Sequence, residues 1–279
     1  MQKFVEQKFI GERAMFGVKD AEFERCGFAA GESPLKHGQN LRLKNCIFEW
    51  KYPLWYAKNI AVEDGFLTQT ARAGIWYAQD VSFKDTLIQA PKSFRRCQNV
   101  RLENVNLTRA EETLWSCADV EIKNVCARGD YFAMNCENVR VYGLNLDGNY
   151  GFDGCKNLLV EDSKLLSKDA FWNCENVTVR NSFISGEYLA WNSKNVTFEN
   201  CVIESLQGLC YVQNLVLRGC QTLDTTLAFE YSSVDAEILG GIVSVKNPLS
   251  GVIRAQEIGE IIMQKECVDP AATRIILEK

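Results

Sequence analysis

The twelve cysteines have the most reactive side chains in the sequence, and nine of them fall at two recurring positions. Regularly spaced thiols could bind a metal, form disulfides or act as nucleophiles. The chain has no Cys-x-x-Cys pair and a single histidine, His37, which argues against a zinc site. Where cysteine is absent from these positions, mostly Gly, Ala, Ser or Val replaces it, so we interpret the thiols as inert small fillers. The two sets are Cys97, Cys117, Cys136, Cys155 and Cys174, and Cys26, Cys46, Cys201 and Cys220.

Five of the six tryptophans share another recurring position, which Lys36, Arg95 and Asp153 occupy elsewhere in the chain. Because charged residues are accepted there, we expect this column to face outward, although packing of the indoles against the core is the alternative. Tyrosines and acids lie three residues before it. Aromatic rings bordered by carboxylates suit sugars, since the rings stack on sugar faces and the acids bind hydroxyls. The candidate ligand-binding residues are Trp115, Trp172, Trp191, Tyr131, Tyr150, Tyr188, Glu112 and Asp169.

Catalytic residues cannot be assigned from this pattern. Glycoside hydrolysis needs two carboxyl groups at a defined separation. Neighbouring repeats about 5 Å apart would bring such pairs together by chance. A single histidine in a polar turn supplies no nucleophilic triad. The sequence therefore leaves open whether the protein is an enzyme, and we expect no cofactor and no metal. The acids near the aromatic column are Glu112, Asp130, Asp153, Asp169 and Glu187.

An internal repeat must position these residues. An Asn or Asp recurs every 19 to 21 residues, and the residues one and three positions after it are always apolar. Alternating apolar residues indicate a strand with one buried face, whereas Asn and Asp mark tight turns. The repeated residues are Asp20, Asn40, Asn59, Asp80, Asn99, Asp119, Asn138, Asn157, Asn176, Asn195 and Asn214.

We call each repeated Asn or Asp the anchor of its repeat. Two further apolar columns lie five residues before and eight residues after the anchor, and together with the alternating pair they predict three short inward strands in each repeat. A period of about 19 residues without a helical pattern predicts an all-β fold, a single-stranded right-handed parallel β-helix in which each repeat is one rung. We expect one domain over 1–279. Its parts are an N-terminal partial rung at 1–14, regular rungs at 15–222, and irregular rungs with an end strand at 223–279.

A column four residues after the anchor supports in-register stacking. Its charges alternate from rung to rung, interrupted only by Tyr142. Like charges stacked about 5 Å apart would be destabilising, whereas alternation places opposite charges beside each other. The column is Glu24, Lys44, Glu63, Lys84, Glu103, Lys123, Tyr142, Glu161, Arg180, Glu199 and Arg218.

Composition narrows the function. A net charge of -5, a pI near 5.2 and the absence of a Lys/Arg run argue against nucleic acid as a partner. The N-terminal segment lacks the apolar core of a secretory signal, and no apolar run approaches the length of a membrane span. We therefore expect a cytoplasmic protein without a membrane partner.

The columns, the repeated sequence NCENV and the Trp-rich turns resemble right-handed parallel β-helix proteins of the pectate-lyase-like type. The chain is similar to an uncharacterised bacterial family of such β-helices, defined only as a domain of unknown function. The resemblance covers 1–279 at the level of rungs and implies the fold but no site. Lyases and polygalacturonases of this fold carry clustered Asp residues for calcium or catalysis, and no matching motif occurs here.

Three functional interpretations follow. The first is a non-catalytic scaffold that binds a ligand or another protein through its aromatic outer face. The alternative is a carbohydrate-active enzyme or carbohydrate binder, and the third is another small-molecule or regulatory role. The terminal rungs of a solenoid have unpaired strand edges, so end-to-end homo-oligomers are a further expectation.

Overall fold

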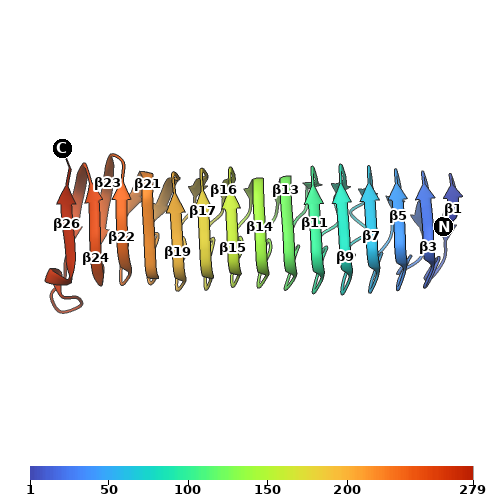
Figure 1. Cartoon of the computed structure of the whole chain (residues 1–279), viewed down its shortest axis with the longest axis horizontal. Coiled ribbons are helices and arrows are strands. Elements are labelled where there is room, and N and C mark those ends of the chain that lie inside the picture. Colours follow the sequence, from blue (N-terminus) through green and yellow to red (C-terminus); the bar gives the residue numbers. More distant parts are fainter. Residues whose placement is uncertain (279) are drawn as a thin grey trace. The chain divides into compact units, whose positions relative to one another are not determined.

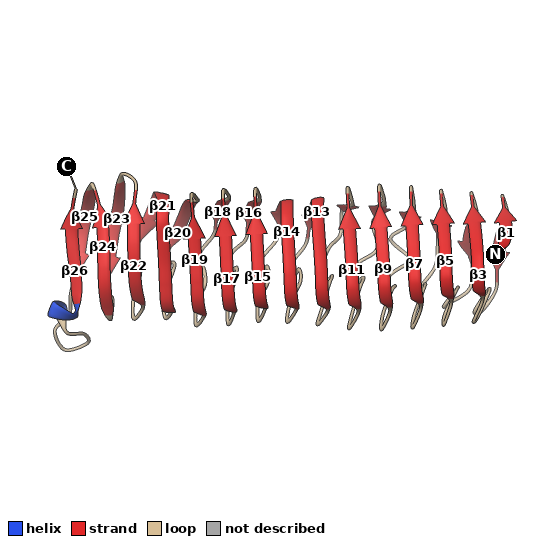
Figure 2. Cartoon of the chain, viewed as in Figure 1, coloured by secondary structure: helices blue, strands red, loops and turns tan. Residues whose placement is uncertain are grey.

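The computed structural model describes residues 1–278, which form strands and one short 3-10 helix, η1 (Pro270–Ala272), with no α-helix among them (Figure 2). The all-β prediction is confirmed. The chain divides into two compact units, Met1–Asn145 and Leu146–Lys279, which we describe separately; a single domain over the whole chain stays a prediction. Within the described residues, no helix is long and apolar enough to cross a membrane.

The first unit is a stack of parallel strands, two for each rung. The longer strands lie side by side in chain order (Figure 1). They are β1 (Gln2–Val5), β3 (Lys19–Glu24), β5 (Gln39–Lys44), β7 (Lys58–Glu63), β9 (Gln79–Lys84), β11 (Gln98–Glu103) and β13 (Ala118–Arg128). The shorter strands are β2 (Lys8–Ile10), β4 (Gly27–Ala29), β6 (Ile47–Phe48), β8 (Phe66–Leu67), β10 (Leu87–Ile88) and β12 (Asn106–Leu107). Strand β14 (Glu137–Asp147) spans the boundary between the units.

The second unit repeats this architecture and ends in less regular strands. Strands β15, β17 and β19 lie side by side in Figure 1 and pair in parallel. The regular strands are β15 (Lys156–Glu161), β16 (Lys164–Leu166), β17 (Glu175–Arg180), β18 (Phe183–Ser185), β19 (Lys194–Glu199), β20 (Val202–Leu206) and β21 (Gln213–Thr226). The C-terminal strands are β22 (Ser233–Ile238), β23 (Gly241–Lys246), β24 (Ser250–Ala255), β25 (Glu257–Ile262) and β26 (Thr273–Leu277).

Strand register follows the sequence repeat. Leu41 lies opposite Ile60, and Ile60 lies opposite Val81, so partners are 19 and 21 residues apart. In the second unit, Leu158 lies opposite Val177. The predicted parallel β-solenoid with rungs of about 19 residues is therefore confirmed, while its right-handedness stays a prediction.

The predicted apolar columns form the core. Residues one and three positions after the anchor are buried in every regular rung. In the column eight positions after the repeated Asn or Asp, aromatic rings stack on each other: the rings of Phe28 and Phe48 lie 5.0 Å apart at an interplanar angle of 11°. Ring contacts therefore add to the burial of apolar area in holding the rungs in register.

The predicted third strand is wrong. Its apolar column is largely buried, but it lies in turns. The residues that follow it form isolated bridges, such as Trp76 with Arg95, and no third strand. Leu35, Leu54 and Phe94 have left-handed backbones, with φ of 56°, 59° and 58°. This conformation is costly for such side chains and coils the chain instead of extending it. An apolar residue repeated at a fixed spacing indicates a buried position, and here the buried residues lie in a turn and not in a strand.

The repeated Asn and Asp residues do adopt the left-handed conformation expected of turns, with φ of 55° at Asn40 and 60° at Asn176. Their side chains also form ladders that the sequence interpretation did not include. The Asn176 amide donates to Asn157 Oδ1 at 2.9 Å, and Asn176 Oδ1 accepts from Asn195 at 2.9 Å. The Asn176 side chain is thus hydrogen-bonded to its counterparts on both neighbouring rungs.

Opposite charges meet between rungs as the alternating column predicts. Lys44 Nζ lies 3.7 Å from Glu63, and Arg180 lies 3.6 Å from Glu161 and 2.6 Å from Glu199. These pairs are partly exposed, so each stabilises the fold only weakly, but together they oppose a shift in register.

Ten of the twelve cysteines are buried. Cys174 donates its thiol hydrogen to Phe152 O at 3.0 Å, and Ser193, at the same position of the next rung, donates to Phe171 O at 2.7 Å. This position therefore favours a small donor that satisfies a buried carbonyl. Burial raises the pKa of Cys46 to about 11 and that of Cys210 to about 12, which disfavours the reactive thiolate.

Thiol reactivity tests this packing role. We expect a disulfide reagent to modify only the exposed Cys126 and Cys267 of the native protein at pH 8, because the other thiols are buried. The remaining cysteines should react after unfolding in denaturant. Rapid modification of a third cysteine in the native state, identified by mass spectrometry of the peptides, would contradict the packing interpretation.

Candidate functional site

The tryptophan column of the first unit is a stack of rings and cations. The indoles of Trp55 and Trp76 lie 5.1 Å apart at 7°. The Arg95 guanidinium lies between two indoles, 4.6 Å from the ring centre of Trp76 and 4.7 Å from that of Trp115. A cation between two indoles is attracted by both rings. The charged residue that suggested an outward-facing column is therefore part of the stack.

Glu112 completes this arrangement as the counter-ion. One carboxylate oxygen accepts from Lys92 Nζ at 2.9 Å, and the other accepts from an Arg95 guanidinium nitrogen at 2.9 Å. The predicted ligand-binding residue Glu112 is thus engaged by two cations of the preceding rung. Trp115 also contacts Tyr131, with ring centres 6.3 Å apart.

Indole N–H groups tie the column to the backbone. Trp55 donates to Ala73 O at 2.6 Å, Trp76 donates to Lys92 O at 2.8 Å, and in the second unit Trp172 donates to Tyr188 O at 2.7 Å. All three carbonyls belong to the following turn. These half-buried indoles therefore link successive rungs, and the packing alternative explains them well.

Five predicted site residues gather in the second unit. Tyr150 packs edge-on against Trp172 at 6.1 Å, and Tyr188 packs edge-on against Trp191 at 5.7 Å. The Trp172 and Trp191 ring centres lie 6.2 Å apart. Asp169 belongs to the same turn as Trp172. The structure thus brings these five together, whereas Glu112, Trp115 and Tyr131 belong to the first unit.

Asp169 has the most unusual environment of the predicted residues. Its side chain is only 6% exposed, and its Oδ1 atom has no hydrogen-bond partner. Burial raises the pKa of this carboxyl, an effect that the nearby Lys168 opposes and that Glu187 and Asp153 reinforce. Tyr150 donates a hydrogen bond to the carboxyl.

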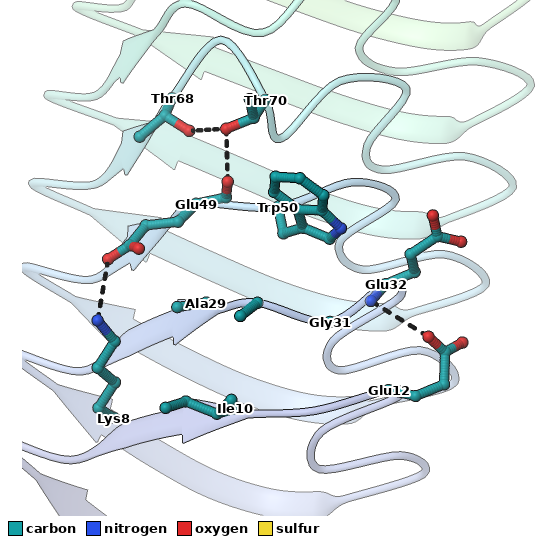
Figure 3. A pocket seen from close by; sticks show the side chains of 11 residues that line it. Lys8, Ile10, Glu12, Ala29, Gly31, Glu32, Glu49, Trp50, Thr68 and Thr70 are labelled. Carbon is teal, nitrogen blue, oxygen red and sulfur yellow. Dashed lines mark hydrogen bonds and ion pairs between the residues drawn. The ribbon is translucent and has the colours of Figure 1, made fainter.

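A groove at the start of the first unit is a site that the sequence interpretation missed. It has a volume of about 980 Å³ and crosses four rungs (Figure 3). Trp50 is 37% exposed there, and Ile10 is 64% exposed. The lining residues are Lys8, Ile10, Glu12, Ala29, Ala30, Gly31, Glu32, Glu49, Trp50, Thr68 and Thr70.

Polar side chains surround the apolar part of this groove. Lys8 Nζ lies 3.9 Å from the Glu49 carboxylate, and the hydroxyls of Thr68 and Thr70 lie 2.9 Å apart (Figure 3). Thr70 also donates to the backbone carbonyl of Glu49 at 2.5 Å. Charged and hydroxyl groups are thus held in place around an exposed indole.

The sequence position of Trp50 is unusual, and a comparison of repeated positions does not reveal it. It is the one tryptophan outside the shared position, ten residues after Asn40. Neighbouring rungs have Ala30, Gln69 and Ala90 there. A large aromatic ring at a position where small or polar residues are usual indicates a local role rather than a repeated one.

Comparison with known proteins places the chain in a family. A family model described as "Protein of unknown function (DUF3737)" matches residues 2–276. The chain belongs to this family. The resemblance drawn from the repeated columns is thereby confirmed, and a comparison with curated proteins finds no match.

Solved structures with a similar fold include sugar-bound and surface proteins. A tailspike protein of E. coli bacteriophage HK620 in complex with a hexasaccharide is 7% identical with a TM-score of 0.45, over 88% of this chain and 65% of that one. The Azotobacter vinelandii mannuronan C-5 epimerase AlgE4 A-module is 10% identical with a TM-score of 0.31, over 99% and 87%. PfbA, a surface adhesin of Streptococcus pneumoniae, is 10% identical with a TM-score of 0.29, over 88% and 68%.

These likenesses concern the fold alone, since identities of 7 to 10% carry no information about ligands. The chain also spans only about 65% of the length of the tailspike protein. Any functional conclusion must come from the side chains described above.

Two tryptophan variants separate structural from accessible indoles. We expect Trp172→Ala to lower the free energy of unfolding by about 2 to 3 kcal/mol, because it removes a half-buried ring and its hydrogen bond to Tyr188. Trp50→Ala should change it by less than about 0.5 kcal/mol, as is usual at exposed positions. Urea unfolding followed by circular dichroism measures both, and equal losses would contradict the assignment.

Proposed function

We propose that this protein is a non-catalytic binding module for a neutral glycan, held in the groove of the first unit. The observation that carries the proposal is the exposed Trp50 indole on a concave surface. Exposed apolar surface rimmed by polar residues commonly marks a ligand-binding groove, and here the indole lies among Ile10, Ala29 and Ala30 with charged and hydroxyl groups around them. An indole face also matches the apolar face of a sugar ring.

Size and lining support a ligand of this kind. A volume of about 980 Å³ is at the upper end of the range usual for ligand sites, about 300 to 1,000 Å³. Apolar atoms of Ile10, Ala29 and Ala30 extend the surface beside the indole. A short oligosaccharide could therefore lie across several rungs.

Hydrogen-bonding groups are suited to hydroxyls. The Glu12, Glu32 and Glu49 carboxylates accept hydrogen bonds. The Thr70 hydroxyl donates its hydrogen to the Glu49 carbonyl and the Thr68 hydroxyl donates to Thr70, so both hydroxyls can accept hydrogen bonds from a ligand. Glu12 already accepts from the backbone N–H of Glu32 at 3.3 Å (Figure 3). These groups surround the indole and could orient a polyhydroxylated ligand.

Charge favours a neutral ligand over an acidic one. Three carboxylates line the groove against one lysine, Lys8. A second lysine, Lys51, lies 5.4 Å from the Trp50 ring centre, but it pairs with Glu32 at 3.0 Å. Glu12 is also paired, 3.8 Å from Arg13, so the groove has no excess of positive charge that would attract polyuronates or other polyanions.

The carboxylate contacts support binding rather than hydrolysis. Glu49 is paired with Lys8 at 3.9 Å, and Glu32 is paired with Lys51 at 3.0 Å. A catalytic pair would require one carboxyl group able to donate a proton. Carboxylates held beside lysines are better suited to accepting hydrogen bonds from a ligand.

Isothermal titration calorimetry tests the proposal with neutral oligosaccharides, namely cellotetraose, xylotetraose and maltotetraose, and with an acidic tetragalacturonate for comparison. We expect at least one neutral sugar to bind more tightly than the acidic one. Trp50→Ala should weaken binding about tenfold or more, because it removes the aromatic anchor. Glu49→Gln tests the polar contribution and should have a smaller effect.

Tyr142→Ala is the matched control, because Tyr142 is an exposed aromatic residue of the same unit outside the groove. It should leave the affinity unchanged. Equal weakening by Trp50→Ala and Tyr142→Ala, or preferential binding of tetragalacturonate, would contradict a neutral-glycan site at this groove.

A further inference from the structure

The second unit contains a buried carboxylate without a contacting cation. Asp169 is only 6% exposed, and its Oδ1 atom has no hydrogen-bond partner. Its sequence neighbour Lys168 is engaged elsewhere, with Nζ 2.9 Å from the Glu187 carboxylate. Tyr150 donates a hydrogen bond to the carboxyl, but Oδ1 itself has no partner. Buried polar atoms are usually paired, so Oδ1 marks a position where a further group can bind.

The repeat itself shows what is missing. Asp169 stands three residues before Trp172, as Glu112 stands three residues before Trp115. In the first unit, Glu112 binds Arg95 and Lys92 of the preceding rung, each at 2.9 Å. The same acid position therefore has two cations in one unit and no contacting cation in the other.

The residues of the preceding rung explain the difference. The position of Arg95 is taken by Asp153 in the second unit, and the position of Lys92 is taken by Tyr150. Asp153 accepts a hydrogen bond from Asn173 at 3.0 Å and adds negative charge near Asp169. The repeat thus replaces a cation by an anion beside a buried carboxylate and a tryptophan.

We propose that Asp169, Asp153 and Trp172 bind an external organic cation, an alkylammonium or guanidinium group, in the position that Arg95 fills in the first unit. The site is separate from the glycan groove and does not depend on it. The ligand cation would pair with Asp169 Oδ1 and lie against the indole of Trp172. Arg95 beside Trp115, at 4.7 Å from the ring centre, is the internal precedent.

The surroundings suit an organic cation. Tyr150 and Tyr188 occupy the same position as Asp169 on the preceding and following rungs, and Tyr150 packs edge-on against Trp172 at 6.1 Å. Aromatic faces with a carboxylate are a favourable environment for ammonium and guanidinium groups. The described residues contain no group of three or more ligating side chains arranged for a metal ion. Because Oδ1 is buried, a ligand reaches it only when neighbouring side chains move.

Calorimetric titration with butylammonium and agmatine tests the site directly, with 1-pentanol and butyrate as neutral and anionic comparisons. We expect the two cations to bind in the millimolar range or tighter and the comparison compounds not to bind. Asp169→Asn removes the charge while keeping the shape and should weaken cation binding about tenfold or more. Glu112→Gln, at the equivalent position of the first unit, is the matched control and should leave it unchanged.

Asp153→Arg is the sharper variant, because it restores the first-unit arrangement within the chain. We expect it to abolish binding of both cations and to raise the melting temperature, by about 2 °C or more. Circular dichroism and thermal melting establish that each variant is folded. The proposal is overturned if neither cation binds the wild-type protein at up to about 10 mM. It is equally overturned if Asp169→Asn or Asp153→Arg, while folded, binds them as the wild type does.

Discussion

In-register stacking of equivalent residues is the constraint on which this structure depends. Each side chain lies against its counterpart on the next rung, about 4.8 Å away. The residues at any one position must therefore pack favourably against each other. Phe rings meet this condition by stacking, Asn side chains by forming amide ladders, and surface charges by alternating in sign, as at Glu161, Arg180 and Glu199. The small buried positions meet it with cysteine or serine, which donate to carbonyls without crowding.

Positions that depart from their column are therefore the informative ones. Trp50 places an exposed indole where neighbouring rungs have small or polar residues, and a groove lined by carboxylates surrounds it. Asp169 lacks the cations that its counterpart Glu112 has. Neither departure helps the solenoid to stack. We attribute both to ligand contact, which is why both proposals rest on exceptions to the repeat and not on the repeat.

Much of the fold could be predicted because stacking turns a one-dimensional period into structure: the apolar pairs, the left-handed Asn turns and the buried thiols all follow from spacing. The failures have physical causes. The column containing Leu35 is apolar in every repeat, as an inward strand would be, but its backbone is left-handed, which spacing does not reveal. For the tryptophan column the sequence left both outward contact and packing open, because spacing does not reveal that Arg95 lies between two half-buried indoles. Trp50 escaped notice because a search for columns discards single occurrences.

The most direct test of in-register stacking is the free energy of unfolding of Arg180→Glu compared with Arg180→Ala, measured by urea denaturation at low and high salt. Arg180 lies between Glu161 and Glu199, so the charge reversal would stack three carboxylates. Stacking predicts that Arg180→Glu is less stable than Arg180→Ala by about 1 kcal/mol at low salt, and that salt removes most of this difference. Equal stability of the two variants at low salt would contradict it.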